Sequence, residues 1–595
     1  MAKKLYIKTY GCQMNIYDSD KMVELLKLLG FEVTPDAKEA DLAILNTCHI
    51  RDKAEQKVYS DLGRLHKHKK NANKEGRDLI IVVAGCVAQA AGDEILRQAP
   101  YVSMVIGPQT YHRLPEYLAR NTLYLVDIEF PIESKFDFLP QTTTTKTSAF
   151  ISIQEGCNKF CTFCCVPYTR GTEFSRPVQT IIEKATHLVD KGVIDITLLG
   201  QNVNAYHGEG PNNTEWGLAR LIEELAKSKN LQRISYTTSH PKDMDDALIQ
   251  AHGDIPTLLP YLHLPVQSGS DAVLKAMNRK HTIARYHEIM NQIKTKRPDI
   301  LVSSDFIAGF PGETDEDHRQ TIQLILDHID TGYSFCYSPR PGTPASIADN
   351  QIPEDIKKQR LHEIQEALTY KQQQRNQADV GKTISVLVEK TGKKENQMIG
   401  KSPYLQSVCF QGKSRLLGCV VDIKITDGFA HTLAGDIVTV TGAPKMGGHP
   451  DLVDIAIHEN SWLQEITAEK WQNLFERCYD LALPHQTDNV SVCFTNNEEM
   501  IGLNTLYRLK PYPTNVLSFP QDTDGILGDV VLSYEVIQQE ATEQGKSFVD
   551  HVTHLFIHGL LHLNGYDHET PEESQAMEQL EIKTLETLGI RNPYA

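Results

Sequence analysis

Cys157, Cys161 and Cys164 lie in the run EGCNKFCTFCC, with the spacing C-x3-C-x2-C. Three thiolates on one short loop are close enough to hold three irons of a cubane cluster. Since a [4Fe–4S] cluster usually takes four cysteines, such a loop leaves one iron open for a small molecule. The alternative, a C-x2-C zinc knuckle, lacks a second pair downstream. The spacing therefore predicts a cluster that takes part in chemistry instead of only carrying electrons.

Three further cysteines, Cys12, Cys48 and Cys86, each follow an apolar strand. The strands read KLYIKTY, DLAILNT and LIIVVAG. Separations of 36 and 38 residues suit one strand–helix–strand unit each, and parallel strands bring their C-terminal ends to one edge of a sheet. One such cysteine would be a small core residue. Three at the same place on successive strands predict metal binding.

Length and composition limit the protein class. For 595 residues we expect roughly three to five domains. No apolar run reaches about 18 residues, so no membrane span is expected, and the N-terminus begins with a strand instead of a signal peptide. Twelve cysteines without a leader indicate a reducing cytoplasm, where thiols bind metal more often than they pair.

The net charge of −17 is unevenly distributed. Residues 451–595 hold seven basic and 24 acidic side chains, which accounts for the whole excess. The first 450 residues hold 53 of each sign. This asymmetry predicts at least two separately built parts.

Periodicity predicts a multidomain α/β chain. After an N-terminal parallel α/β domain, six strands between Phe150 and Tyr337 indicate a partial (β/α)6 barrel, with the cysteine loop directly after its first strand. A polar helix over 351–377 and short β segments over 383–441 follow, and the latter suit a small barrel that binds RNA or serves as a structural appendage. Residues 142–146 and the run GAPKMGGHP are expected boundaries. The expected domains are 1–120, 143–375, 376–446 and an α+β domain over 451–595.

The first 445 residues or so resemble a known family. The matching runs are KTYGCQMNIYDSDKM, ILNTCHIRDKAEQK, VVAGCVAQ, GCNKFCTFC, VPYTRGTEFSRP, LLGQNVNAY, HLPVQSGSDAVLKAMNRKHT and DFIAGFPGETDEDH. The cysteine loop is similar to that of the radical S-adenosylmethionine superfamily, and the whole stretch resembles its methylthiotransferases, with an RNA-binding TRAM domain over 376–446. GCQMNIYDSDKM is most similar to the branch acting on isopentenyladenosine in tRNA; the threonylcarbamoyladenosine branch is the alternative.

This resemblance implies two [4Fe–4S] clusters and S-adenosylmethionine. The cluster on Cys157, Cys161 and Cys164 would cleave the cofactor reductively to a 5′-deoxyadenosyl radical, which abstracts hydrogen from C2 of the adenine. The cluster on Cys12, Cys48 and Cys86 would supply sulfur, and a second S-adenosylmethionine the methyl group. An sp2 C–H resists acid–base catalysis, so the cofactor must carry this step. The implied partners are the anticodon loop of a tRNA, whose target base must be unstacked, and an electron donor.

Several residues near these motifs have two interpretations. Gly200 and Gln201, like Gly309, Gly312 and Glu313 of the run GFPGE, follow strands and suit either cofactor contact or a tight turn. Arg170 and Arg176 either meet the cofactor carboxylate or a tRNA phosphate, or are solvated. Cys165 replaces the family's usual aliphatic residue and is expected to be a neighbour of the cluster, since the regular spacing is satisfied without it.

The run HGLLHLNGYDH places His558 and His562 four residues apart on one helical face, with His568 after a glycine turn. Three histidines with an open fourth position predict a catalytic zinc site. His554 lies one turn earlier and suits a core or supporting role. The spacing equals that of metzincin proteases, but Gly559 stands where their general-base glutamate is required.

The same run, with LNTLYRLKPYPTNVLSFP and GDVVLS, resembles a bacterial family of rRNA-maturation endoribonucleases. The resemblance implies that Arg508 holds phosphate or the transition state, a role that suits a guanidinium. Asn515 replaces a usual aspartate and Tyr512 a usual lysine. Because the domain is acidic, RNA contact should be confined to the zinc site with Arg508 and Lys510.

The sequence thus predicts a bifunctional, monomeric RNA-processing enzyme: a tRNA methylthiotransferase fused to a zinc-dependent endoribonuclease that acts on rRNA of the small ribosomal subunit. One alternative is a binding protein whose clusters transfer electrons and whose tail binds ribosomes. For the tail alone, a zinc hydrolase of another kind remains open.

Overall fold

The computed structural model describes residues 3–48, 52–131, 133–140, 146–394, 396–440, 452–483, 488–523, 526–568 and 570–594. Of the expected boundaries, 442–450 and all but residue 146 of 142–146 lie outside this part of the chain. Contacts divide the protein into two units, one of residues 1–411 with 416–447 and one of residues 412–415 with 448–595. Each unit is described by itself.

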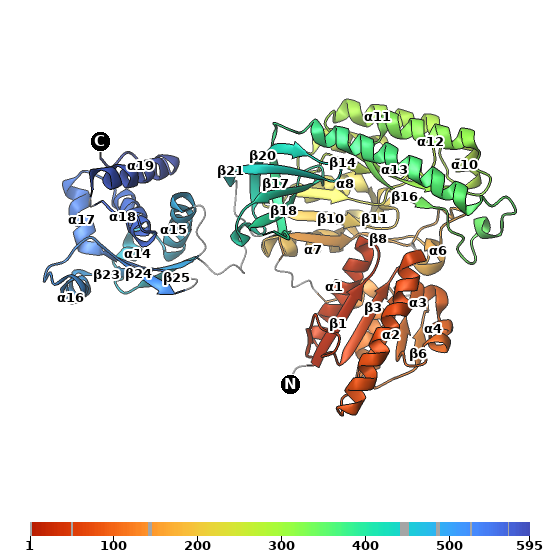
Figure 1. Ribbon diagram of the computed structural model, residues 1–595, viewed down its shortest axis with the longest axis horizontal. Coiled ribbons are helices and arrows are strands. Elements are labelled where there is room, and N and C mark those ends of the chain that lie inside the picture. Colours follow the sequence, from red (N-terminus) through yellow and green to blue (C-terminus); the bar gives the residue numbers. More distant parts are fainter. Residues whose placement is uncertain are drawn as a thin grey trace. The chain divides into compact units, whose positions relative to one another are not determined.

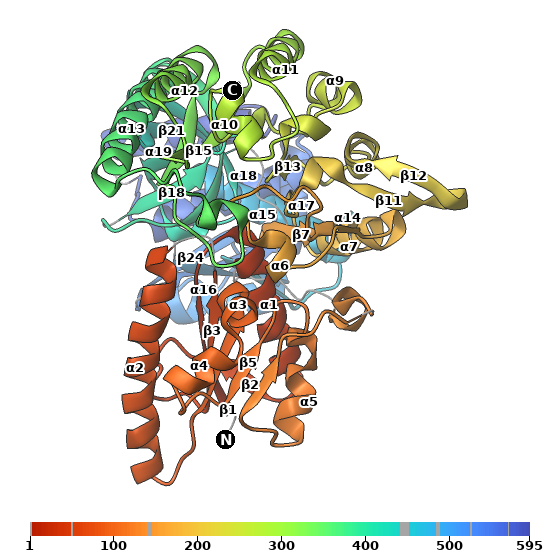
Figure 2. The ribbon, with the colours of Figure 1, turned by 90° about the vertical axis from the view of Figure 1, so that its right-hand side faces the viewer.

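The first unit begins with a parallel sheet in the order β2-β1-β3-β4-β5-β6. The three expected strands are its centre: β1 (Lys3–Thr9), β3 (Leu42–Thr47) and β4 (Ile80–Gly85). The short strands β2 (Phe31–Val33), β5 (Met104–Ile106) and β6 (Leu125–Asp127) extend it. The helices α2 (Asp52–Lys74), α3 (Cys86–Ala91) and α4 (Asp93–Gln98) cover one face, and α1 (Gln13–Lys27) and α5 (Leu114–Ala119) the other (Figure 2).

All six expected strands of the second α/β domain are present and confirm the fold prediction. They are β7 (Ser148–Ser152), β10 (Asp195–Leu199), β13 (Arg233–Tyr236), β14 (Tyr261–His263), β15 (Leu301–Ala308) and β16 (Thr331–Cys336). They form two parallel three-stranded sheets, joined by a bridge between Ile234 and Leu258. The covering helices are α7 (Val178–Asp190), α8 (Leu218–Leu225), α9 (Asp246–Asp254), α10 (Asp271–Ala276), α11 (Ile283–Lys296) and α12 (Asp315–His328) (Figure 1; α9 in Figure 2). A hairpin of β11 (His207–Gly210) and β12 (Thr214–Gly217) was not anticipated.

A closed five-stranded barrel follows the long helix α13 (Glu354–Gln377), as expected. Its strands are β17 (Thr383–Thr391), β18 (Gln397–Lys401), β19 (Ser407–Gln411), β20 (Val420–Gly428) and β21 (Thr432–Val440). Arg233 at the start of β13 is 5% exposed and donates to the backbone oxygens of Lys401 and Ser385, both at 2.9 Å. The barrel is therefore fixed to the α/β domain by a guanidinium that caps two barrel carbonyls.

Four buried charges join the N-terminal domain to the second α/β domain. Arg170 donates to Asp18 of α1 at 2.7 Å and to Glu155 at 2.6 Å. Lys135 lies 2.7 Å from Glu155 and 3.5 Å from Asp18. None of these four side chains is more than 3% exposed. Two cations and two carboxylates thus neutralise one another, which is the condition for burying ionised groups.

The second unit is a four-stranded sheet in the order β22-β23-β25-β24, with β24 antiparallel. Its strands are β22 (Val453–Ile457), β23 (Asn489–Thr495), β24 (Val516–Thr523) and β25 (Ile526–Ser533). On one face α15 (Ala468–Ala482), α18 (Phe548–Leu563) and α19 (Pro571–Thr587) pack around Trp462, which stacks on Phe494 at 4.1 Å. Met500 of α16 (Asn497–Arg508) packs on the other face, and α14 (Trp462–Glu465) and α17 (Tyr534–Glu543) complete the domain.

In the part of the chain that the structure covers, every helix is too short or too polar to cross a membrane.

Replacing Arg170 by Met should destabilise the first unit by about 3–5 kcal/mol, because Asp18 and Glu155 would stay buried with one cation between them. Urea unfolding of anaerobically purified protein measures the change. The matched control is Arg64→Met, which removes a 71% exposed partner of Asp61 and should cost less than about 1 kcal/mol. Equal effects of the two substitutions would contradict the proposed importance of the buried network.

Candidate functional site

The C-x3-C-x2-C loop lies between the short strand β8 (Gln154–Glu155) and helix α6 (Val166–Thr169). It is entered through Gly156 at φ 75°, where an added Cβ would lie 2.0 Å from the carbonyl oxygen of Thr172. The backbone N–H of Thr162 donates to Met277 at 3.1 Å. Burial raises the pKa of Cys157, and the neighbouring Cys161 raises it further. A bound metal cation would favour the thiolate form of this cysteine, which fits an iron cluster.

Gln154, which the sequence did not single out, fixes this loop to the end of β10. Its side-chain oxygen accepts the N–H groups of Gln201 at 2.9 Å and Asn202 at 3.1 Å, and its amide donates to Gly156 at 2.8 Å. The Gln201 side chain accepts from Gly156 N–H at 2.5 Å. A Cβ at Gly200 would lie 2.5 Å from the Gln154 oxygen. In this structure Gly200 and Gln201 therefore shape the cysteine loop.

Three polar side chains near the cysteine loop have buried atoms that lack a hydrogen-bond partner among the described residues. Arg279 lies 3.7 Å from the Cys161 sulfur through Nη1, while its Nε has no partner among the described residues. Nε2 of His240 and both ring nitrogens of His281 are likewise unpaired there. Because buried polar atoms are normally satisfied, these groups fit a polar cofactor such as S-adenosylmethionine. The sequence did not predict a role for these residues, because the two histidines occur singly, in the runs SHP and RKHT.

The run GFPGE forms a tight turn after β15. Gly309 and Gly312 have φ of 71° and 81°, which glycine adopts without strain. Glu313 accepts the N–H of Gly309 at 2.8 Å and pairs with Arg360 of α13 at 2.9 Å. Its carboxylate is thus engaged within the protein and closes the turn.

The other three cysteines follow the C-terminal ends of the neighbouring strands β1, β3 and β4. A Cβ at Gly11, which precedes Cys12, would lie 2.2 Å from the Cβ of Cys48, so these two loops touch. Burial raises the pKa of Cys86, and the guanidinium of Arg170 moderates the rise. Arg170 therefore lies beside the cysteine edge as well as in the buried network.

The structure settles the surroundings of two more residues. Arg176 is buried, donates to the backbone oxygen of Ser152 at 2.8 Å and lies over the ring of Phe136 at 4.6 Å. Neither Arg170 nor Arg176 is a solvated arginine. Burial, and then proximity to Cys86, raises the pKa of Cys165 to about 11. Cys165 thus lies between the two cysteine sets.

In the second unit, His558, His562 and His568 converge. One ligand atom from each lies within 4.8 Å of the others. The Nε2 atoms of His558 and His562, on successive turns of α18, are 3.1 Å apart, and Gly565 at φ 85° turns the chain towards His568. Burial and the two neighbouring imidazoles lower the pKa of His562, which favours the neutral ring that binds metal.

Glu581 of α19 contacts His558 of this site, and the sequence did not predict this role. Its fully buried carboxylate accepts from His558 Nδ1 at 2.8 Å and from His554 Nε2 at 3.1 Å, and Tyr594 also donates to it. Burial alone would raise the pKa of Glu581, but these hydrogen bonds outweigh it and lower the pKa to about 2. The carboxylate orients Nε2 of His558 towards His562, the arrangement typical of metal-binding histidines.

Arg508 and Lys510 are exposed at the end of α16. The described hydrogen bonds and ion pairs do not connect either of them to the histidines. Tyr512 is 54% exposed, and its backbone oxygen accepts from Asn504 at 2.7 Å. The histidine site is therefore built independently of these three residues.

Four family models match the chain in order: uncharacterized protein family UPF0004 over 4–107, the radical SAM superfamily over 151–325, the TRAM domain over 377–438 and endoribonuclease YbeY over 456–589.

Two relatives are the tRNA-2-methylthio-N(6)-dimethylallyladenosine synthases of Rickettsia rickettsii (strain Sheila Smith) and Rickettsia felis. Each is 53% identical over 446 residues, 74% of this chain and 100% of the relative. Among solved structures, the radical S-adenosylmethionine methyltransferase TsrM from Kitasatospora setae is 13% identical over 58% of this chain and 74% of its own, with a TM-score of 0.43. The family assignment rests on the sequence relatives. The chain belongs to the tRNA-2-methylthio-N(6)-dimethylallyladenosine synthase family and carries a C-terminal endoribonuclease YbeY domain.

Proposed function

We propose that the chain is a bifunctional RNA-processing enzyme. Its first unit would add a methylthio group to C2 of N(6)-isopentenyladenosine in the anticodon loop of tRNA, and its C-terminal domain would cleave RNA during rRNA maturation. The observation that carries the first activity is similarity over the whole length of the two synthases. It is supported by one cysteine triad at the ends of three neighbouring strands and a second triad on a single loop. The three convergent histidines carry the second.

In the first activity, Cys157, Cys161 and Cys164 would hold the [4Fe–4S] cluster that binds S-adenosylmethionine. The bound pair supplies the radical chemistry that an unactivated sp2 C–H demands. Gln154 keeps the cysteine loop in place, and the unpaired Nε of Arg279 can bind the cofactor's anionic end.

Cys12, Cys48 and Cys86 would hold the auxiliary cluster, which supplies sulfur. Arg170 stands beside them and compensates thiolate charge. Cys165 lies between the two triads as a free thiol. An external donor must deliver electrons, and a reducing cytoplasm suits all of these thiols.

The substrate is proposed to be tRNA because a barrel matching the TRAM model is fixed to the α/β domain through Arg233. An adenine inside a duplex cannot reach the cysteine loop, so a loop nucleotide that leaves the stack is required. Similarity to the two isopentenyladenosine-type synthases does not favour the threonylcarbamoyladenosine branch.

Replacing cysteines of the two triads should separate the two roles. Cys161→Ala should abolish formation of both 5′-deoxyadenosine and methylthio-adenosine, because the cofactor loses its cluster. Cys48→Ala should abolish the methylthio product and leave 5′-deoxyadenosine formation. Mass spectrometry of nucleosides and iron quantification provide the readouts. Cys409→Ala, in the barrel, is the control. A methylthio product from Cys48→Ala would contradict the assignment of the auxiliary site.

In the C-terminal domain, His558, His562 and His568 would bind zinc, and Glu581 would hold the His558 ring. Zinc supplies Lewis-acid activation of a water at the open position. A metzincin protease would need a general-base glutamate at position 559, and the structure leaves no room for that side chain. A Cβ at Gly559 would already lie 2.9 Å from Val530 and 3.1 Å from Ser518. This crowding favours the nuclease, with Arg508 as the candidate phosphate-binding residue.

Asn515, the departure from the family pattern, has a specific partner. Its amide donates to Glu540 at 3.0 Å, and Glu540 also accepts from His551 at 2.9 Å. Asn515 Oδ1 accepts the N–H of Val516 at 2.7 Å. An aspartate could make the last of these bonds and would repel Glu540. Asn515 is therefore matched to Glu540, and its described hydrogen bonds do not involve His558, His562 or His568.

Zinc affinity should depend on Glu581. Glu581→Gln should weaken zinc binding by about 10–100-fold, because the amide orients His558 less firmly than the carboxylate does. Competition with a chromogenic chelator measures the affinity, and a fluorescent rRNA fragment reports cleavage. Glu572→Gln, at an exposed position of α19, should leave both unchanged. RNA cleavage by a zinc-free His562→Ala variant would overturn the nuclease assignment.

Asn515→Asp should lower the stability of the C-terminal domain by about 1.5–3 kcal/mol, because a charged hydrogen bond to Glu540 is removed and two carboxylates face each other. Urea unfolding of the full chain, followed by tryptophan fluorescence, measures the change, since two of the three tryptophans, Trp462 and Trp471, are buried in this domain. Asn515→Ala, which adds no charge, should be less destabilising. A more stable aspartate variant would contradict the pairing.

A further inference from the structure

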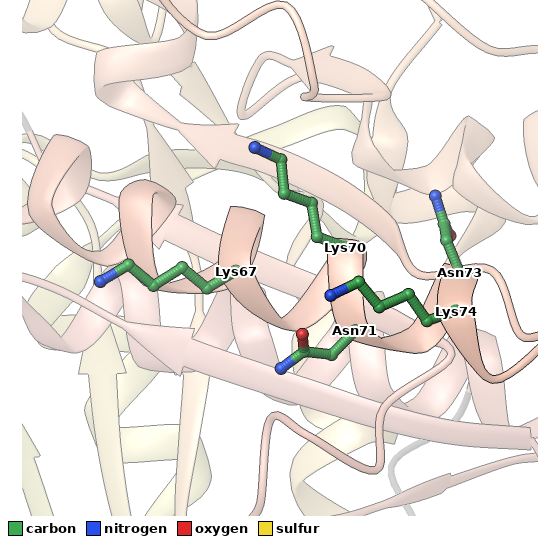
Figure 3. Close-up of a pocket in the computed structure, with 5 residues that line it drawn as sticks. All are labelled: Lys67, Lys70, Asn71, Asn73 and Lys74. Atoms are coloured by element: carbon green, nitrogen blue, oxygen red, sulfur yellow. The ribbon is translucent and has the colours of Figure 1, made fainter.

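One face of helix α2 carries exposed lysines, which do not pack on the first sheet and have no role in the proposed cysteine chemistry. Lys67, Lys70, Asn71 and Lys74 follow the i, i+3, i+4, i+7 spacing that places side chains on one helical face. All four are exposed. In Figure 3 the three lysines project from successive turns of the helix, beside the two asparagines. With Asn73 they line an open recess of about 470 Å³. We call Lys67, Lys70 and Lys74 the lysine stripe.

The opposite face of α2 explains why the helix forms. Val58, Leu62, Leu65 and Ala72 are buried against the first sheet. That packing orients the helix so that the lysine stripe faces outwards. No acidic residue lies between Asp61 and Glu75 to offset the stripe, although like charges at these spacings destabilise a helix.

The charge of the lysine stripe is uncompensated. Among the described side chains, no carboxylate lies within ion-pair distance of Lys67, Lys70 or Lys74. The nearby acids already have other partners. Asp61 pairs with Arg64 at 3.1 Å, Glu75 with Arg77 at 2.9 Å, and Asp78 lies 3.9 Å from Lys69. The stripe is therefore a local concentration of positive charge within the first 450 residues, which hold equal numbers of basic and acidic side chains.

We propose that the lysine stripe binds the phosphate backbone of the tRNA, at a distance from the nucleotide that is modified. This inference rests on the proposed function of the first unit. Three cations in a row along one helix face complement a chain of phosphates. Lysines act as point charges that bind phosphate without reading bases.

The position of the stripe excludes a contact with the reacting nucleotide alone. Helix α2 begins four residues after Cys48 and rises about 1.5 Å per residue. Lys67 and Lys74 therefore lie roughly 22 Å and 33 Å along the helix from its start. Only a substrate much longer than one nucleotide can span both places. The recess is too open to enclose a small molecule. The lysine and asparagine side chains that line it offer no apolar anchor of the kind that a protein interface uses.

The test compares tRNA binding by the full-length holoenzyme and by its Lys67→Gln/Lys70→Gln/Lys74→Gln variant over a range of salt concentrations. The variant should bind tRNA more weakly. The slope of log affinity against log salt should fall by about 3, one for each phosphate that a lysine no longer neutralises. At saturating tRNA, kcat for methylthiolation should be unchanged while KM rises, because no removed group is near the cysteines.

A second triple variant, Lys27→Gln/Lys38→Gln/Lys229→Gln, removes the same charge from scattered exposed positions and should keep most of the affinity and slope. Unchanged tRNA binding by the stripe variant would overturn the proposal, as would an equal loss in the scattered variant. Unchanged tRNA binding with loss of turnover driven by a protein electron donor, but not by dithionite, would assign the stripe to that donor instead.

Binding is measured independently of product formation, so the two proposals fail separately. If the wild-type protein binds tRNA through the stripe but yields no methylthio-adenosine, the proposed reaction is wrong and the docking surface stands.

Discussion

The first unit depends on a buried, neutral set of four charges. Asp18 belongs to the domain that carries Cys12, Cys48 and Cys86, whereas Glu155 and Arg170 flank the C-x3-C-x2-C loop. Lys135 joins both carboxylates from the segment between the domains. Since an unpaired buried charge is costly, the arrangement tolerates little displacement of one cysteine set relative to the other. Electrostatic pairing thus holds together two sites that sulfur insertion would need side by side.

Buried or partly buried carboxylates with several partners also organise the second unit. Glu581 is fully buried and serves His554, His558 and Tyr594 together. Glu540 serves Asn515 and His551 in the same way. In both cases one carboxylate orients groups from separate elements, so that polar side chains inside the domain keep their partners. Some of the acidic residues of this domain therefore have defined structural roles.

Much of the architecture could be predicted from periodicity. All six strands between β7 and β16 and the five-stranded barrel appear where alternating apolar residues and turn signals place them. The strands β2, β5 and β6 were missed because three residues are too few to show a period. For Arg170 and Arg176 the sequence left ligand contact and solvation open, and burial excludes solvation. The sequence could not show this, because their partners lie in other segments of the chain.

What the sequence determined by itself was the set of potential ligands. Cys157, Cys161 and Cys164, and likewise His558 and His562, are brought together by local spacing on one loop or one helix, which needs no knowledge of the rest of the chain. The tertiary structure alone decided which groups surround them: Gln154 and Arg279 at the cysteine loop, and Glu581 beneath the histidines. These contacts form only when elements far apart in the sequence pack, because burial selects a partner for each polar group and no local pattern records that choice.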